Sequence, residues 1–495
     1  MNHPTRRDAI LGLAAGSALA AGAEAAASPI HWMSAIEMER LIRTKKLSAR
    51  EALADHLKQI DRVNPKVNAI VTLVPEIAQK AAAQADEMQA RGARLGPLHG
   101  LPAAHKDLRE TRGIRTTFGS PLYRDYIPTA NDFLIDRLQG AGVITLGKTN
   151  TPEFGSGSQT FNPVFGATRN PWDLTKTCGG SSGGAAVALA CGMVPVADGS
   201  DTGGSLRNPA SFCNVAGFRP TVGRVPDPKA AFAWSTLTTQ GCLGRSIADL
   251  AFVLSAIAGP DPRSPLSISE PGALLARPLG RSFKGVRVAW FKNLGGVPFD
   301  PRVLAVVNGH RATFAALGCI VEEAEPDFSL ADISFRRLRA WGSANSYGAR
   351  LREHPDGFKD TLKGEIEEGL RLTGTELAAA EVARGQLWRH FQAFLEKYEY
   401  FVLPTVQLPP FDVTTPYPAE IAGVQFPSYI DWMKSCWYIS ATGNPAASVP
   451  GGFTAEGLPV GVQIVGRNQA DFSVLQMAHA FEEAAGSSKK RPPVA

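Results

Sequence analysis

Ser205 follows two glycines in the sequence GSDTGGS, which spans Gly199 to Ser205. Glycine lets the backbone turn tightly, so consecutive N–H groups can point at one place. Such a group of donors forms an oxyanion hole, which stabilises the negative charge that develops on a carbonyl oxygen. We therefore predict that Ser205 is a nucleophile, with the oxyanion hole formed by the backbone of Thr202, Gly203 and Gly204.

A second serine motif, GSSGG, formally matches the GxSxG pattern with Ser182 at its centre. A nucleophile elbow requires a strand directly before the serine, and the preceding residues NPWDLTKTC are typical of a loop. The elbow also needs a late histidine, whereas His390 and His479 lie in helical, charged stretches. We therefore reject the elbow interpretation and expect that the base is not a histidine.

Lysine can act as the base when burial or a nearby cation keeps it neutral. Lys106 lies in GLPAAHKDL, where it follows an apolar run and precedes Asp107. Of the lysines, it is the best placed to point inward from the end of a strand. A surface lysine in a loop fits the same pattern equally well, so the residues alone leave this role open.

The elements that would position these residues alternate between helices and short apolar strands, which favours an α/β fold with a mostly parallel sheet. MVPVADG is predicted to be a strand that ends at the Ser205 loop, and GGAAVALA a helix that begins just after Ser181 and Ser182. A charged helical stretch is predicted from about 34 to 63. A helical excursion without strands is predicted over about 332–399.

Composition and charge argue against a nucleic-acid-binding protein and against a zinc protein. The chain has 495 residues, 44% of them hydrophobic, and a net charge of only +5, with no dense basic stripe for nucleic acid. None of the six cysteines forms a CxxC pair or a cluster with zinc spacing, so we expect buried packing cysteines and no metal or organic cofactor.

Residues 1–27 have the pattern of an export signal. Arg6 and Arg7 precede an apolar stretch from Ala9 to about Ala21, and small residues follow it. The stretch is too short and too rich in alanine and glycine to span a bilayer stably. We predict a twin-arginine signal that is cleaved, an exported protein in the periplasm or outside the cell, and a mature chain 28–495 without stable membrane insertion.

The Gly/Ser-rich stretch from Gly179 to Pro220 resembles the signature of the amidase signature family. Three further segments match that family in order, so the resemblance extends over nearly the whole mature chain: GLPAAHKDL, LGKTNTPEF and Gly443–Gly466. It implies a single large α/β domain with a mixed, mostly parallel central sheet covered by helices on both faces. His105 departs from the pattern, because an aliphatic residue is commoner before the lysine.

The resemblance also implies a Ser–cis-Ser–Lys triad. Ser205 is then the nucleophile, Ser181 the bridging serine whose bond to Gly180 is cis, and Lys106 the base. The implied reaction is hydrolysis of a linear amide through an acyl-enzyme. Ser182, Asp201 and Arg207 fall on positions that support the triad, although polar residues of a Gly-rich turn would look the same.

The sequence does not define the substrate. The stretch 155–161, the helical excursion and the aromatic side chains of Trp432, Trp437 and Tyr438 could line an apolar pocket for an aryl or acyl amide, or could simply form core. The alternatives are an esterase or aryl acylamidase, an amidotransferase-like component of a larger complex, and a catalytically silent binding protein. A homodimer is left open.

Overall fold

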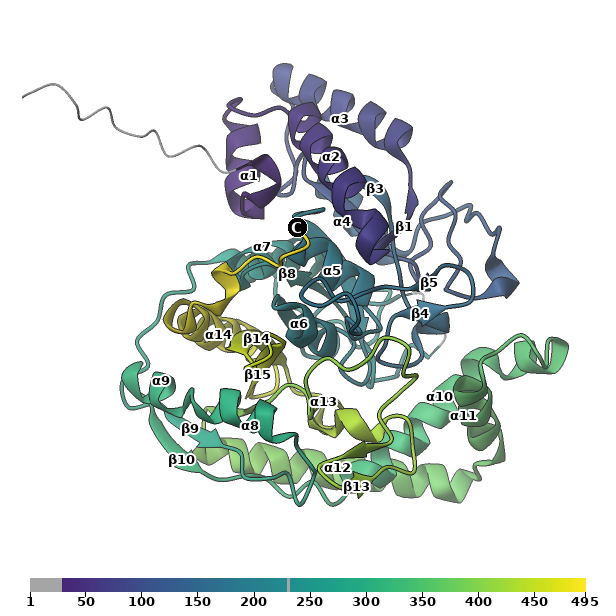
Figure 1. Ribbon diagram of the computed structural model, residues 1–495, viewed down its shortest axis with the longest axis vertical. Coiled ribbons are helices and arrows are strands. Elements are labelled where there is room, and N and C mark those ends of the chain that lie inside the picture. Colours follow the sequence, from purple (N-terminus) through teal and green to yellow (C-terminus); the bar gives the residue numbers. More distant parts are fainter. Residues whose placement is uncertain (1–28, 229–231) are drawn as a thin grey trace, which may run out of the picture.

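The computed structural model describes residues 29–228 and 232–495 (Figure 1). The predicted export signal, 1–27, lies outside the described residues. An eleven-stranded sheet forms the centre of the chain. Its strands follow one another in space as β1 (Ile70–Leu73), β3 (Ile144–Thr149), β2 (Pro102–Lys106), β6 (Val196–Asp201), β8 (Thr239–Gly244), β7 (Ala216–Arg219), β14 (Ala446–Phe453), β15 (Pro459–Gly466), β11 (Tyr400–Pro404), β9 (Arg287–Trp290) and β10 (Ile320–Glu323).

The sheet is mixed. Strands β3, β2 and β6 run parallel, as do β11, β9 and β10. Every neighbouring pair from β6 through β8, β7, β14 and β15 to β11 is antiparallel. The prediction of an α/β fold is confirmed. Fewer of the neighbouring strand pairs are parallel than the alternation of helices and strands suggests. The short turn between β14 and β15 is one reason, because it is too short for the crossover that parallel strands need.

Helices cover both faces of the sheet. Gly461 of β15 faces Ser211 of α6 (Arg207–Cys213), whereas Gly466 faces Val474 of α14 (Asp471–Ala485). The two glycines are five residues apart on a regular strand, so they point to opposite faces. Six more helices of the domain are α4 (Phe133–Gly140), α5 (Gly183–Ala190), α7 (Ile247–Ile257), α8 (Pro301–Asn308), α9 (Arg311–Ala316) and α13 (Lys434–Thr442).

The predicted N-terminal helical stretch is two helices, α1 (Ala35–Arg43) and α2 (Ala49–Val67), which correct the single run expected over 34–63. Lys45 interrupts the run with φ 60°, a left-handed conformation that no helix continues. Ser48 then starts α2 with a capping box to Glu51. Helical periodicity alone did not reveal this break.

The stretch from 331 to 397 contains three helices and no strand. They are α10 (Ala331–Glu353), α11 (Asp360–Arg371) and α12 (Gly374–Lys397). In Figure 1, α10 and α11 lie side by side and project to the right of the sheet. A small apolar cluster joins them to the segment before β4 (Phe161–Asn162), through Phe154, Phe358 and Leu362.

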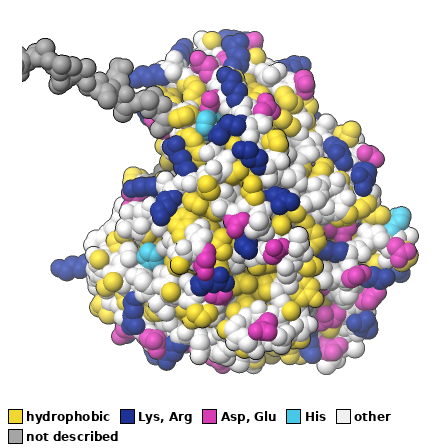
Figure 2. Space-filling model, viewed as in Figure 1, with side chains coloured by type: hydrophobic (Ala, Val, Ile, Leu, Met, Phe, Trp, Pro, Cys, Tyr) yellow, Lys and Arg dark blue, Asp and Glu magenta, His cyan; other side chains and the backbone are white. Residues whose placement is uncertain are grey.

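The remaining elements are the helix α3 (Pro75–Ala90), strand β5 (Gly166–Ala167), which pairs with β4, and the hairpin of β12 (Glu420–Ile421) and β13 (Val424–Gln425). All six cysteines are buried free thiols. Within the described ranges no helix is long and apolar enough to cross a membrane. On the face shown in Figure 2, basic side chains are interspersed with acidic and apolar ones.

Candidate active site

Lys106 lies at the end of β2 and is completely buried. Its Nζ is within hydrogen-bonding distance of three serine hydroxyls: Ser181 Oγ at 2.7 Å, Ser182 Oγ at 2.9 Å and Ser200 Oγ at 3.3 Å. No carboxylate contacts this amine among the described residues. The structure therefore excludes the surface-lysine interpretation and brings Lys106 together with both serines of the GSSGG motif, Ser181 and Ser182.

The surroundings of Lys106 favour its neutral form. Burial lowers its pKa, and the nearby positive charge of Arg109 lowers it further, whereas Asp198 and Asp201 oppose the shift; the result is a pKa of about 7. Above that pH the amine is mostly unprotonated and has a lone pair that can accept a proton. A buried lysine in contact with hydroxyl groups can thus serve as a base near neutral pH.

The loop before α5 carries Ser181 and Ser182, and the peptide bond between Gly180 and Ser181 is cis. Neighbouring hydroxyl groups hold this loop: Ser158 Oγ donates to the Gly180 carbonyl at 2.8 Å, and Thr160 Oγ1 donates to the Gly179 carbonyl at 2.8 Å. The segment that the sequence suggested for substrate contacts therefore also holds the loop that carries Ser181.

Ser205 lies in the turn between β6 and α6, and its side chain is half-buried. The Ser182 N–H donates to the Ser205 carbonyl at 3.2 Å, which joins the two serine loops directly. In the described ranges the Ser205 hydroxyl makes no hydrogen bond. Ser205 is thus a half-buried residue on the loop next to the one that carries Ser181 and Ser182.

The glycines of this turn are required by its shape. Gly204 has φ +116°, and an added Cβ would lie 2.6 Å from the Cβ of Cys436. Its N–H donates to Asp201 Oδ1 at 2.9 Å, so this donor is used inside the turn. This corrects the expected oxyanion hole in part, because the Gly204 N–H already has an acceptor. Of the three predicted donors, the N–H groups of Thr202 and Gly203 remain for an oxyanion.

Asp201 and Arg207 form a fully buried ion pair that fixes the turn. Arg207 Nη2 lies 2.9 Å from Asp201 Oδ1, and Arg219 Nη1 lies 3.1 Å from the same oxygen. Burial opposes ionisation of Asp201, yet the two arginines outweigh it and hold the pKa of this carboxyl below its usual range. Arg207 also donates to Gln463 Oε1 at 2.6 Å and to Ser440 Oγ at 2.7 Å, so it links the turn to β15 and α13.

Sequence reasoning missed three residues of this site. Ser200 contacts the lysine amine, although nothing in the GSDTGGS motif distinguished it from its neighbours. His105 and Asp198 form a buried pair directly beside Lys106, with Nδ1 and Oδ2 2.6 Å apart. The only signal in the sequence was the unusual histidine before the lysine, which gave no hint of its partner.

A cavity of about 380 Å³ adjoins the turn at Thr202. Gly155 and Ser156 lie on one side, and residues of α10 and α11 form much of the rest. Its apolar lining consists of Phe154, Phe232, Leu237, Leu338, Tyr347 and Leu362. Trp432 and Trp437 do not line it; both are fully buried, and Trp437 stacks on Phe335 with ring centres 4.8 Å apart, so these aromatic side chains are core.

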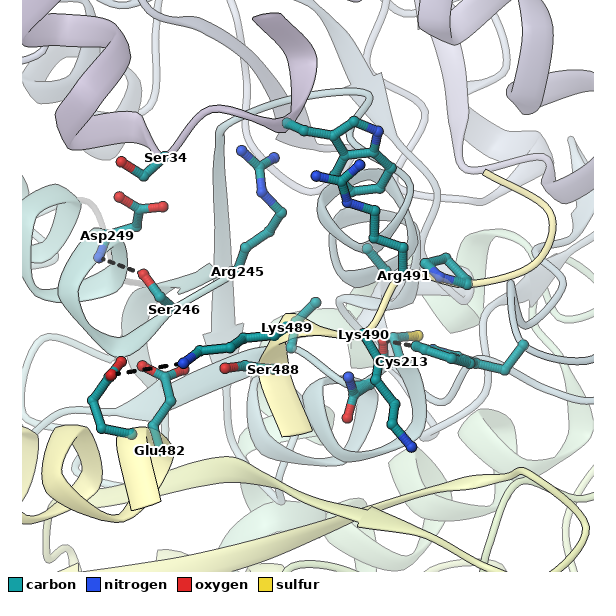
Figure 3. A pocket seen from close by; sticks show the side chains of 17 residues that line it. Ser34, Cys213, Arg245, Ser246, Asp249, Glu482, Ser488, Lys489, Lys490 and Arg491 are labelled. Carbon is teal, nitrogen blue, oxygen red and sulfur yellow. Dashed lines mark hydrogen bonds and ion pairs between the residues drawn. The ribbon is translucent and has the colours of Figure 1, made fainter. Parts of the chain in front are cut away.

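A second cavity lies away from these residues, between the N-terminal segment, α7 and the C-terminal tail (Figure 3). Glu482 and Glu483 of α14 border it, and His479 lies within reach of both carboxylates. Lys489 Nζ lies 4.0 Å from Glu483 Oε2, so a cation of the chain itself pairs with one of these carboxylates. This cavity contains none of the residues predicted to be catalytic.

Known proteins that are similar to this chain are amidases and related enzymes. The amidase family model matches residues 51–475. An acylamidase of Rhodococcus erythropolis is 38% identical over 94% of this chain and 98% of its own length, and a glutamyl-tRNA(Gln) amidotransferase subunit of Moorella thermoacetica is 36% identical over 94% and 99%. The crystal structure of a bacterial aryl acylamidase superimposes with a TM-score of 0.87 at 29% identity, covering 93% of this chain and 98% of that one.

The chain therefore belongs to the amidase family, and in particular to its amidase signature enzymes. It is an enzyme that hydrolyses the C–N bond of an amide. The resemblance that the serine–glycine motifs indicated is confirmed at the level of the family, and the substrate is a small-molecule amide.

Proposed function

We propose that this amidase acts through an acyl-enzyme on Ser205, with Ser181 and Lys106 as a proton relay. The observation that carries the proposal is the contact of 2.7 Å between the buried Lys106 amine and the Ser181 hydroxyl, next to a half-buried Ser205 whose hydroxyl has no partner in the described ranges. A base, a bridging hydroxyl and a free nucleophile thus occur together at the end of a sheet.

In the first half-reaction Ser205 Oγ attacks the amide carbon. Its proton passes to Ser181 Oγ as the Ser181 proton passes to neutral Lys106, and the carbonyl oxygen becomes an oxyanion. The N–H groups of Thr202 and Gly203 stabilise that charge. The ammonium of Lys106 then returns the proton through Ser181 to the leaving nitrogen, the C–N bond breaks, and the amine departs.

In the second half-reaction water attacks the ester carbon of the acyl-enzyme. The relay takes a proton from this water, and Ser205 Oγ leaves with that proton restored. The products are a carboxylic acid, which ionises, and free enzyme. The chain's own residues supply each proton transfer, so no step draws on a metal ion or organic cofactor.

We propose that the substrate is an aryl or acyl amide. The supporting observations are the apolar, partly aromatic lining of the cavity at Thr202 and the similarity to an acylamidase and an aryl acylamidase. Arg339 and Glu365 also line the cavity and form an ion pair with each other, so Asp227, which accepts a hydrogen bond from Gln240, is the acidic side chain of the lining that remains to disfavour an anionic substrate. Aromatic anilides should therefore give higher kcat/KM than short alkyl amides.

The amidotransferase interpretation has one specific observation in its favour, the 36% identity to the Moorella thermoacetica protein. Its test is glutaminase activity: hydrolysis of free glutamine as fast as the best anilide would favour it over the acylamidase proposal. Parallel assays with matched aryl esters separate amidase from esterase preference.

The direct test is labelling of the purified protein with a fluorophosphonate, followed by mass spectrometry of the modified peptide. A label on Ser205 supports the acyl-enzyme proposal. A label on Ser182 would instead revive the elbow interpretation, and the absence of any label would favour a catalytically silent scaffold.

We also propose that residues 1–27 direct export of the folded protein to the periplasm. The support is the arginine pair Arg6–Arg7 and the apolar stretch that follows it. Expression of the full chain and of an Arg6→Lys/Arg7→Lys variant tests this. Periplasmic protein with a new N-terminus near residue 28, lost in the variant, is expected; equal distribution of both proteins would contradict it.

A further inference from the structure

The pair formed by His105 and Asp198 has no role in the reaction described above. His105 is on β2 and Asp198 on the adjacent parallel strand β6, and both are buried, with side-chain exposures of 0% and 1%. His105 Nδ1 contacts Asp198 Oδ2 at 2.6 Å, and its Nε2 contacts Thr145 Oγ1 on β3 at 2.9 Å. The imidazole therefore links three parallel strands beside the catalytic lysine.

The second oxygen of Asp198 contacts the main chain of the lysine itself. Asp198 Oδ1 accepts a hydrogen bond from the Lys106 N–H at 3.1 Å, just beyond the paired residues Ala104 and Ala197. The carboxylate thus holds the end of β2 where the strand ladder stops. Successive strand residues point to opposite faces, so His105 and Lys106 lie on opposite sides of the sheet, joined by this one acid.

The charge of Asp198 also reaches the lysine. The charged and titratable groups around the pair are Lys106 on β2, Arg109 after it, Asp132 beside Arg109, Lys148 on β3, Asp201 on β6 and Cys242 on β8. Burial and Arg109 lower the pKa of Lys106, whereas Asp198 raises it. His105 favours ionised Asp198, because its hydrogen bond lowers the pKa of a carboxyl that burial alone would raise.

We propose that His105 and Asp198 are positioning residues for Lys106, which fix the end of β2 and place one buried negative charge near its side chain. The inference rests on the proposed function of Lys106 as the base. An aliphatic residue at 105 would leave Asp198 Oδ2 without its partner while Oδ1 kept the Lys106 N–H, so the histidine and the acid act as one unit.

The experiment measures the rate of Ser205 labelling by a fluorophosphonate as a function of pH, in the wild type and in Asp198→Asn. Loss of the negative charge makes Lys106 easier to deprotonate, so the rise in labelling rate should move to lower pH by about 0.5 to 1 unit. One unit below the wild-type midpoint, the variant should react about 2.5 to 5.5 times faster when each rate is normalised to its plateau. A merely structural role would lower the plateau without moving the midpoint.

Two further variants test whether the shift comes from the charge of Asp198 itself. His105→Leu/Asp198→Leu replaces the pair with apolar side chains, which a buried site tolerates better than a lone charge, and should show the same shift as Asp198→Asn. Asp249→Asn makes the same change at a buried acid near the second cavity and should leave the midpoint in place.

The labelling results separate the role of the His105–Asp198 pair from the role of Ser205 as the nucleophile. If wild-type Ser205 is labelled but the midpoint of both folded variants equals that of the wild type, the role of the pair is overturned alone. If wild-type Ser205 takes no label, the proposed function is overturned and the role of the pair with it.

Discussion

Two buried clusters lie at the end of β6, and each contains a basic side chain. The two basic side chains differ in whether they keep their proton. Arg207 is bonded to the carboxylate of Asp201, which Arg219 also contacts, so the cluster remains ionised and holds the turn rigid. Lys106 is equally buried, but among the described residues its amine contacts only hydroxyl groups. Burial, together with the nearby charge of Arg109, lowers its pKa to about 7. A buried cation with an acid in contact stabilises structure, whereas one with hydroxyl partners gives up its proton and can act as a base.

Removal of the nucleophile should have the largest effect on activity. We expect Ser205→Ala to lower kcat by at least about 10⁴-fold, because in the proposed mechanism the acyl-enzyme forms on this hydroxyl. The fold should persist, since the Ser205 side chain makes no hydrogen bond in the described ranges. Anilide hydrolysis and circular dichroism measure the two properties; substantial turnover by the folded variant would show that another residue attacks.

Substitution of Lys106 can be compared with the same substitution at a second buried lysine, Lys148. Lys106→Met should lower kcat about 10²- to 10⁴-fold, the usual contribution of a general base. Lys148 is also fully buried and contacts Thr111 Oγ1 at 3.0 Å and Thr116 Oγ1 at 3.1 Å, but it touches neither serine loop.

Lys148→Met should therefore lower the melting temperature but retain most of the rate per folded molecule. Equal losses of kcat in the two methionine variants would contradict the assignment of the base, because burial of a lysine would then explain both.

Removal of the acid in the other cluster should affect stability first. Asp201→Asn leaves Arg207 and Arg219 buried without a counter-ion, so the free energy of unfolding should fall by about 3–5 kcal/mol. Urea unfolding measures this loss. A variant as stable as the wild type would show that the acid does not balance the two arginines.

Ser182 should give the smallest effect. Ser182→Ala removes one hydrogen bond from the Lys106 amine but leaves the contact with Ser181, so kcat should fall roughly three- to tenfold. Ser181→Ala, measured alongside, should be far more severe. Similar losses in the two variants would mean that either serine can bridge to Ser205.

The sequence predicted much of this site because its motifs place glycines and serines where the backbone must turn. The strands that carry Lys106 and the Ser205 loop were predicted, since continuous apolar runs mark buried strands. The antiparallel centre of the sheet was not, because strand order depends on contacts between distant segments. The His105–Asp198 pair was missed for the same reason: its partners are 93 residues apart and meet only through the pairing of β2 with β6.

The Gly204 donor was misassigned for a different reason. A Gly-rich turn predicts N–H groups that converge, but not which acceptor they meet, and here the nearest acceptor is the carboxylate of Asp201. Similarly, the aromatic residues near α13 could have lined a pocket or formed core. Only the packing of Phe335 on Trp437 shows that Trp437 belongs to the core.

The central claim is that Lys106 is a neutral base that activates Ser205 near neutral pH. The most direct measurement is the pH dependence of the rate at which a fluorophosphonate modifies wild-type Ser205. The account predicts a rate that rises about tenfold per pH unit below about pH 7, where Lys106 is protonated, and reaches a plateau above it. A rate that stays constant from pH 5 to pH 9, in enzyme that remains folded, would contradict it.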